Sequence, residues 1–334
     1  MGGHALKTVT TVRKPLNEYN LIKEHVLNVL HIYGLEAESV LELPGKTDFG
    51  DLDVIVKFNQ NPRDIVQQFH PREIVVSGDV YSFDFRFSEN DEAFQIDLIK
   101  VHNIEMAQFY LGYSDIGSIL GRIVNCYALK FGHVGLWAHV LNNTIHPDKK
   151  IDQRCEIGKV MLSESPQEIC TFLGLDYEKY KSGFESKISI FQWIMQCTYF
   201  NPDYFKQLKY EHRRRSVMRP FYIDFLKYIN VSVSDVKPLD NCMDGCIKKN
   251  IQMFAISHFN KEKDLEYLLL KNENKNQMQE KFNGRLFLER GIEPKEIGKT
   301  ICQFKESIGT TFDEWIMSYS KEEIIVKIDL FLGV

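Results

Sequence analysis

The chain has 334 residues, of which 44% are hydrophobic and 26% are charged. This composition is that of a folded globular protein and excludes wholesale disorder. A formal net charge of −5 excludes an overall basic surface, so any contact with nucleic acid must come from a local basic patch. No stretch approaches the ~18 uninterrupted apolar residues of a membrane span. Seven irregularly spaced cysteines and the lack of an apolar stretch near the start predict a reducing, cytoplasmic location without membrane contact.

The first hundred residues combine one helix with several strands. Apolar residues at helical spacing predict a helix over residues 18–33, which ends at Gly34. Alternating and β-branched runs predict strands over residues 39–43, 51–58, 74–77, 80–87 and 93–101. Gly78 and Asp79 form a short hairpin turn between two of them. From Ser114 onward the strand signals fade, and the chain is predicted to be mostly helical.

This order of elements predicts an α+β protein. A small mixed β-sheet with flanking helices is followed by a mostly helical C-terminal region. The polar, proline-containing segment of residues 142–153 is the best candidate for a linker. We therefore expect a first domain over residues 1–141 and a helical region over residues 154–334.

Residues 45–56 carry the clearest chemical signal. A turn at Gly45 leads into a strand that begins with Asp51 and Asp53. Because side chains alternate along a strand, these two carboxylates project from the same face. Asp97 lies in a later apolar strand, residues 93–101, where an ionised carboxylate is costly unless it is paired or bound to a metal ion.

Three carboxylates on neighbouring strands suit a centre with two Mg²⁺ ions, and Mn²⁺ accepts the same ligands. Two such ions can hold the attacking and the leaving oxygen of an in-line displacement. In that arrangement Asp51 and Asp53 bind both ions, and Asp97 binds the ion at the attacking hydroxyl. All three are therefore candidate catalytic and metal-ligating residues. The alternative is an ordinary surface strand start together with a salt-bridged Asp97.

A helix is predicted over residues 114–131, directly after the last strand, with Ser114 as its N-cap. One face is apolar. The other carries Asp115, Ser118, Arg122 and Asn125. An acid, a hydroxyl, a guanidinium and an amide suit the binding of a base, a ribose and a phosphate. The alternative is a solvated helix face.

In this order the motifs resemble those of the DNA polymerase beta-like nucleotidyltransferase superfamily. Gly50-Asp51-Leu52-Asp53 matches its Gly-Asp-x-Asp strand, and Ile96-Asp97-Leu98-Ile99 matches its third aspartate. The segment FYLGYSDI at residues 109–116, with Arg122 beyond it, matches the aromatic-Gly-Ser-Asp segment and helix of the polymerase branch. The resemblance covers about residues 39–132 and implies a nucleotidyltransferase palm. It implies that the three aspartates bind the metal ions, with Asp115, Ser118 and Arg122 near the base or template.

The turn before the first aspartates departs from this pattern. The family usually has a serine after the glycine, whereas Lys46 follows Gly45 here. Lys46 can contact a phosphate as a point charge, so Gly45 and Lys46 are candidates for nucleotide binding. The segment before residue 39 is also too short for the DNA-binding domain that precedes the palm in the polymerase branch.

Two later segments are candidates for contacts with nucleic acid. The first is a predicted basic helix, bent or ended by Pro220, that contains Lys206, Lys209, His212, Arg213, Arg214, Arg215 and Arg219. Its alternatives are a solvated face and a triphosphate site at one arginine. The second resembles the tail of the tRNA nucleotidyltransferase and poly(A) polymerase family, with Asn283-Gly284 before Gly-x-x-Pro-x-x-Ile-Gly at residues 291–298. Pro294 suits the first turn of a helix there, and Lys295 and Lys299 lie beside free N–H groups that suit a phosphate. The alternative is helix–helix packing.

Together these observations predict a metal-dependent transferase that moves an NMP from an NTP to an acceptor hydroxyl and releases pyrophosphate. The expected acceptor is an RNA or tRNA 3′ end, extended without a template. One alternative is transfer to a protein or a small molecule, as in toxin-type or antibiotic-modifying relatives. The other is a non-catalytic nucleic-acid-binding protein on the same fold.

Overall fold

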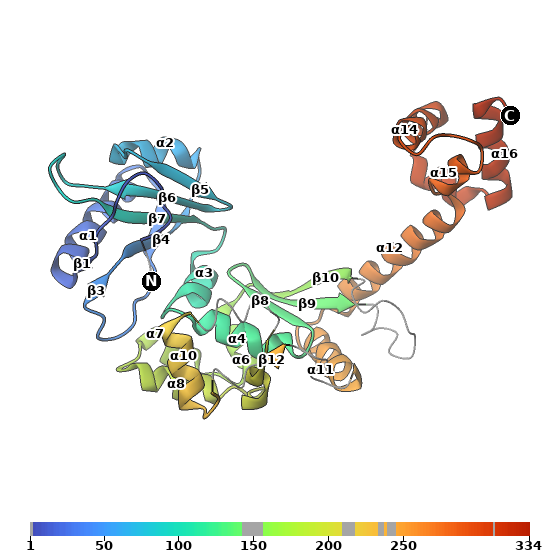
Figure 1. The fold of residues 1–334 in the computed structure, drawn as a ribbon. Coiled ribbons are helices and arrows are strands. Elements are labelled where there is room, and N and C mark those ends of the chain that lie inside the picture. Colours follow the sequence, from blue (N-terminus) through green and yellow to red (C-terminus); the bar gives the residue numbers. More distant parts are fainter. Residues whose placement is uncertain (1–2, 142–155, 209–217, 233–236, 239–244, 310) are drawn as a thin grey trace. The chain divides into compact units, whose positions relative to one another are not determined.

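The computed structural model describes residues 3–141, 156–208, 218–232, 237–238, 245–309 and 311–334. The chain divides into two compact units, Met1–Lys261 and Glu262–Val334. The predicted α+β class is confirmed, since a mixed sheet lies in the first unit and the second unit is helical (Figure 1). None of the helices within the described ranges is both long enough and apolar enough to span a membrane.

The first unit contains all of the described strands. In chain order its elements are β1 (Lys14–Pro15), α1 (Leu16–Ile32), β2 (Glu36–Ser39), β3 (Asp48–Phe49), β4 (Asp51–Lys57), α2 (Pro62–Val66), η1 (Gln67–Phe69), β5 (Ile74–Ser77), β6 (Val80–Phe85), β7 (Phe94–Lys100), α3 (Ile104–Leu111), α4 (Ile116–Asn125), β8 (Leu129–Gly132), β9 (Gly135–Leu141), β10 (Glu156–Ser163), α6 (Pro166–Leu173), α7 (Tyr177–Ser182), α8 (Lys187–Met195), η2 (Pro202–Lys206), β11 (Gln207–Leu208), α10 (Pro220–Tyr228), β12 (Lys237–Pro238) and α11 (Gly245–His258).

A five-stranded sheet with the order β2-β4-β7-β6-β5 forms the centre of the first part of this unit. β4 and β7 are parallel, and the other neighbouring pairs are antiparallel. The predicted helix α1 and strands β4 to β7 are confirmed within a few residues, as is the hairpin turn between β5 and β6. The strand predicted at residues 39–43 is displaced to β2, where the buried Ala37 faces the core.

Alternation along β4 separates a hydrophobic face from a polar face. Leu52, Val54 and Val56 are fully buried in the core between the sheet and α1. Asp51 and Asp53 therefore point to the opposite face. β7 continues the pattern, because its Ile96 and Leu98 belong to the same core and leave Asp97 on the face of the other two aspartates.

Residues 129–163 depart from the mostly helical prediction for the chain after Ser114, because they contain three strands. α4 ends at Asn125, because Ala128 adopts a φ of 55° and the chain turns into β8. β8, β9 and β10 form an antiparallel sheet, so the prediction of helix through residue 131 is wrong. Ser114 is also not the N-cap of α4. It has a φ of 70°, and Asp115 occupies the cap position without a side-chain cap bond.

The expected domain boundary differs from the compact division of the chain. The predicted linker, residues 142–153, lies outside the described residues, and the strands on either side of it, β9 and β10, pair with each other. The first compact unit continues to Lys261. A functional boundary after residue 141 stays a prediction.

The second unit is a small helical bundle. Its helices are α12 (Glu262–Lys281), α13 (Arg285–Leu288), α14 (Ile297–Ile308), α15 (Phe312–Ser318) and α16 (Lys321–Leu332). The core is aromatic at its centre, where Phe282, Phe287 and Phe304 are buried against one another. This arrangement gives the unit a core of its own.

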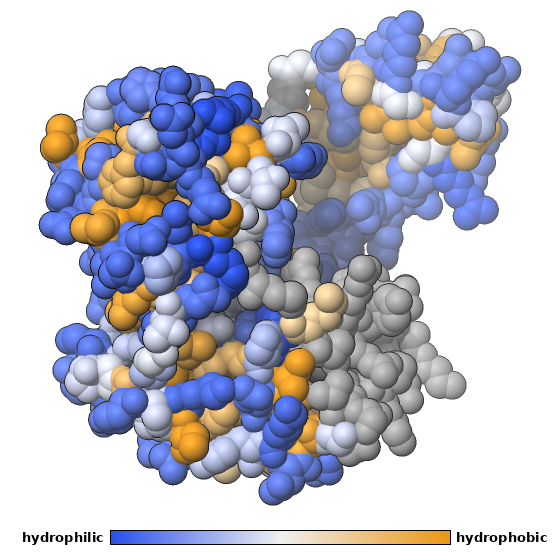
Figure 2. Space-filling model, turned by 60° about the vertical axis from the view of Figure 1, so that its left-hand side comes forward, coloured by the Kyte–Doolittle hydropathy of each residue, from blue (hydrophilic) through white to orange (hydrophobic). Residues whose placement is uncertain are grey.

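The face drawn in Figure 2 is mainly hydrophilic. On the face drawn in Figure 2, hydrophobic residues form small areas among larger hydrophilic ones. Scattered apolar residues of this kind are normal on a protein surface and do not by themselves mark a binding site.

Candidate metal centre on the central sheet

Three aspartates converge on the polar face of the five-stranded sheet. β4 and β7 pair in parallel with Asp53 opposite Asp97 and Asp51 opposite Gln95. One carboxylate oxygen from each of Asp51, Asp53 and Asp97 lies within 4.8 Å of the other two, and all three residues are partly buried. The register of two strands therefore brings together the carboxylates that the sequence separates into two motifs.

The electrostatics of the three carboxylates are unfavourable without a cation. Burial, followed by repulsion from Asp51 and Asp97, raises the pKa of Asp53 well above its ordinary value. Burial is also the main cause that raises the pKa of Asp97 to about 6, although hydrogen bonds from Ser82 and Gln95 oppose the increase. Like charges this close disfavour simultaneous ionisation. A divalent cation removes that repulsion, so the donor set fits Mg²⁺ or Mn²⁺, which prefer carboxylate oxygens.

A proton and a cation should compete for this site. We expect the affinity for Mn²⁺ to fall about tenfold for each pH unit below the pKa of Asp97, which is about 6, because a bound cation must displace a proton there. Isothermal titration of the full chain with Mn²⁺ from pH 5 to 8 measures this dependence. A constant affinity over that range would contradict the raised pKa.

Two side chains that the sequence did not single out contact Asp97. Gln95 is 1% exposed, and its Nε2 donates to Asp97 Oδ1 at 2.9 Å and to Oδ2 at 3.1 Å. Ser82 stands opposite Asp97 on β6 and is also buried. Both lie on the same face of the sheet as the triad, because side chains alternate along a strand. For Gln95, two residues before Asp97, this alternation could have been recognised in the sequence.

The turn at Gly45 and Lys46 lies near the triad. Gly45 has a φ of 75°, which favours glycine, and Lys46 forms an ion pair with Glu42. The Lys46 ammonium is 4.6 Å from the ring centre of Phe49, and its charge opposes in part the burial and repulsion that raise the pKa of the nearby Asp53. Lys46 is therefore a positive charge beside the carboxylates, which is compatible with its predicted contact to a phosphate.

Polar side chains at the N-cap of α4 and along the helix contact residues that lie further along the chain in the first unit. Asp115 is 5% exposed and pairs with Arg219, which also lies 3.4 Å from the Ser118 hydroxyl. Arg122 donates from Nε to the Tyr204 carbonyl at 2.8 Å. The alternative of a solvated face is thus wrong for Asp115, and its partner is an arginine of the predicted basic segment. A nucleotide contact by these residues stays a prediction.

The basic segment is not a single helix. Lys206 ends the 3-10 helix η2, and Pro220 begins α10, whose N-cap is Arg219. The prediction that Pro220 bends or ends a basic helix is therefore wrong, since proline suits the first turn. Arg213, Arg214 and Arg215 lie outside the described residues, as do Lys209 and His212.

The tail motif forms part of the second unit's internal packing. A Cβ at Gly284 would lie 3.2 Å from Ile297 Cγ2, so this glycine permits close packing against the start of α14. α14 begins at Ile297, which leaves Pro294 and Lys295 in the turn before the helix. Lys295 pairs with Glu293, and Lys299 is exposed. The contact at Gly284 favours the packing alternative for the motif, and a phosphate contact by the two lysines stays a prediction.

A cavity of about 460 Å³ lies elsewhere in the first unit, between α1 and the connection from β6 to β7. Its lining includes Lys14, Phe85, Arg86 and Glu92, and none of the three aspartates belongs to it. Basic, acidic and aromatic side chains are mixed around this space, so they define no single ligand chemistry. The candidate site remains the triad.

The fold and the cluster define an α+β protein with three aspartate carboxylates gathered on one face of its mixed sheet. No protein-family model matches the chain, and no curated protein does. Among solved structures, two ternary complexes of polymerase beta from Leishmania infantum, one described as P/T and one as gap, are similar to it. Each has a TM-score of 0.37 and 13% identity over 50% of this chain, and the alignments cover 74% and 69% of those chains. A similarity at this identity and TM-score does not indicate a function, whereas the chemistry of the aspartate cluster does suggest one.

Proposed function

We propose that the protein is a metal-dependent nucleotidyltransferase that transfers an NMP from an NTP to an acceptor hydroxyl. The observation that carries the proposal is the convergence of Asp51, Asp53 and Asp97 on one face of the sheet, with oxygens within 4.8 Å of one another. Three mutually repelling carboxylates, two of which (Asp53 and Asp97) have raised pKa values, are a costly arrangement that cation binding explains.

Each residue has a distinct role in this reaction. Asp51, Asp53 and Asp97 would hold divalent cations, which supply positive charge to the attacking and leaving oxygens when bound. Asp97 is held by Gln95 and would take the proton of the acceptor hydroxyl. Lys46 lies beside Asp53 and suits a contact with the triphosphate. The acceptor oxygen forms a bond to the α-phosphorus as the bond to pyrophosphate breaks.

The acceptor we propose is the 3′ end of an RNA such as a tRNA, extended without a template. Support comes from the resemblance of residues 282–299 to tRNA nucleotidyltransferase and poly(A) polymerase, and from the exposed Lys295 and Lys299 in that segment. Arg213, Arg214, Arg215 and Arg219 complete the candidate contacts with nucleic acid. The cationic side chains of such contacts would bind phosphates and make the affinity depend on salt.

A transfer assay tests the proposal. The full chain with Mg²⁺ is incubated with each NTP or dNTP, labelled at the α- or the γ-phosphate, and with a mixed pool of tRNA and oligonucleotides. We expect label from the α-position, and none from the γ-position, at RNA 3′ ends. Oxidising the terminal ribose with periodate beforehand should abolish labelling, because it destroys the acceptor hydroxyl.

The outcomes distinguish the candidate functions. Label on a protein or a small molecule that persists with oxidised RNA would favour the corresponding alternative acceptor. Absence of product from all acceptors, combined with RNA binding that does not depend on Asp97, would favour a non-catalytic nucleic-acid-binding protein and overturn the proposal.

A further inference from the structure

The segment of residues 3–13, called the arm below, reaches the aspartate cluster from outside the sheet. The backbone N–H of Gly3 donates to Asp51 Oδ2 at 3.0 Å. Two residues on, the backbone N–H of Ala5 donates to the side-chain oxygen of Gln95 at 2.9 Å. The arm thus contacts one candidate metal ligand directly and a second, Asp97, through the amide of Gln95.

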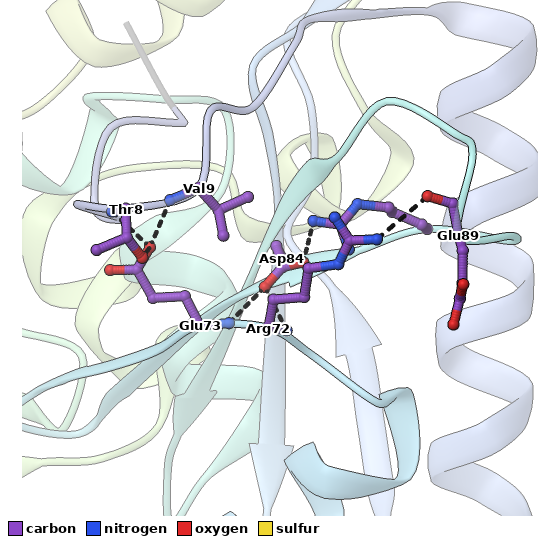
Figure 3. Close-up of polar contacts among 7 residues, drawn as sticks. Thr8, Val9, Arg72, Glu73, Asp84 and Glu89 are labelled. Atoms are coloured by element: carbon purple, nitrogen blue, oxygen red, sulfur yellow. Dashed lines mark hydrogen bonds and ion pairs between the residues drawn. The ribbon is translucent and has the colours of Figure 1, made fainter.

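Glu73, directly before the edge strand β5, holds the middle of the arm through its carboxylate (Figure 3). Glu73 accepts hydrogen bonds from the backbone N–H groups of Lys7, Thr8 and Val9, each at 2.8 Å, and from the Thr8 hydroxyl at 2.7 Å. Partial desolvation raises the pKa of Glu73, but these four bonds outweigh it and lower the pKa to about 2. Glu73 therefore stays ionised and holds the arm throughout the physiological pH range.

The position of Glu73 is itself determined by a buried acid. Asp84 is 1% exposed, and its Oδ1 accepts from the backbone N–H groups of Arg72 at 2.8 Å and Glu73 at 2.7 Å. The Arg86 guanidinium lies 2.7 Å from the other oxygen of Asp84. Figure 3 shows that these contacts connect β6 to the arm. Glu73, which anchors the arm, is thus bound to β6 of the central sheet.

The tip of the arm fits only a glycine. Gly3 has a φ of 81°, and a Cβ at this position would lie 2.3 Å from the carbonyl oxygen of Gly50, the residue before Asp51. The Thr11 hydroxyl donates to the Gly3 carbonyl at 2.8 Å, so the two ends of the arm are joined beside the site. Close backbone approach of this kind is what glycine permits.

We propose that the arm is a positioning element of the metal centre, in which Gly3 orients Asp51 and Gln95 orients Asp97. This inference rests on the proposed function, because it requires that the triad binds a divalent cation. The physical reason is that metal-ligating carboxylates are oriented by hydrogen bonds from outside the coordination shell, and the loss of such a partner costs about 10–100-fold in metal affinity or activity. The N–H donors also offset part of the repulsion among the three carboxylates.

Mn²⁺ binding to the full chain, without nucleotide, tests the arm separately from catalysis. Electron paramagnetic resonance of free Mn²⁺ gives the affinity. We expect Gly3→Ala to weaken Mn²⁺ binding about 10–100-fold, because the added Cβ displaces the arm from Gly50. Glu73→Ala, which releases the arm at its remote anchor, should weaken binding by about tenfold.

Two matched variants serve as controls. Gly78→Ala also adds a Cβ at a positive φ, but no atom of the described residues lies within 4 Å of it. Glu36→Ala removes a carboxylate that pairs with Lys57 at 2.8 Å and does not contact the arm. Both should bind Mn²⁺ within about twofold of the unchanged chain. The unfolding temperature of each metal-free variant identifies loss of folding, and Glu73→Ala keeps the test valid if Gly3→Ala does not fold.

The inference and the proposed function fail in different ways. If the unchanged chain binds Mn²⁺ and both arm variants bind it equally well, the arm does not position the triad and only the inference is lost. Tighter binding by the arm variants would mean that the arm competes with the cation, which also overturns it. If the unchanged chain binds no Mn²⁺, the proposed metal centre fails and the inference falls with it.

Discussion

Asp53→Asn is expected to abolish nucleotidyl transfer and to make the metal-free protein more stable. Burial and the neighbouring Asp51 and Asp97 raise the pKa of Asp53, so its ionised form destabilises the folded state at neutral pH. Asparagine removes this charge at nearly constant volume. Transfer should fall by about a thousandfold or more, since several kcal/mol of charge stabilisation are lost. Calorimetry with and without Mg²⁺, together with the transfer assay, measures both effects.

The direction in which Mg²⁺ shifts the unfolding temperature is a second test of this prediction. Mg²⁺ should raise the unfolding temperature of the unchanged chain and have little effect on Asp53→Asn, because only the complete triad binds the cation in the folded state. Asp203→Asn is the control, since the Asp203 side chain is 67% exposed and its ion-pair partner among the described residues is a surface lysine, Lys206. If Asp53→Asn lowered the stability of the metal-free chain, the raised pKa would be wrong.

Gly117→Ala is expected to destabilise the first unit by about 2–3 kcal/mol, which is the cost of overpacking a well-packed site. A Cβ at Gly117 would lie 2.1 Å from the Tyr110 carbonyl oxygen, so α4 could no longer pack against the end of α3. The loss corresponds to a decrease of roughly 5–10 °C in the unfolding temperature. Thermal and urea unfolding monitored by circular dichroism measure it.

Gly121→Ala on the same helix is the matched control. Its Cβ would meet only the Phe131 carbonyl oxygen at 3.7 Å, an ordinary contact. Because alanine is favoured over glycine inside a helix by about 1 kcal/mol, this variant should be as stable as the unchanged chain or slightly more stable. Equal stability of the two variants would show that the α3–α4 contact at Gly117 relaxes at little cost.

The sheet and the aspartate cluster could be predicted because both depend on the two-residue period of a strand. Leu52, Val54 and Val56 alternate with Asp51 and Asp53, so the buried face and the polar face are readable before any packing is known. Asp97 could be assigned to the same face once its apolar neighbours were taken as core. The parallel register that places Asp97 opposite Asp53 is a tertiary property, and it had to come from the structure.

Other features could not be predicted, because their sequence patterns fit both a helix and a strand or because their contacts leave no pattern in the sequence. Phe131 fits the apolar face of a helix, yet it belongs to β8, since short apolar runs suit strands and helices alike. Asp115 pairs with Arg219, more than a hundred residues further along the chain, and local spacing does not predict such a partner. The bonds from the arm to Asp51 and Glu73 come mostly from backbone N–H groups, which carry no side-chain signal.

The parallel pairing of β4 with β7 has a consequence for folding. β5, β6 and β7 follow one another as antiparallel neighbours and can pair through local contacts. The parallel pairing of β4 with β7 is non-local, because β5 and β6 lie between these strands in the sequence. The three carboxylates come together only at this last, non-local step. Their mutual repulsion thus opposes the closing of the sheet, and a cation present during synthesis or refolding would accelerate it.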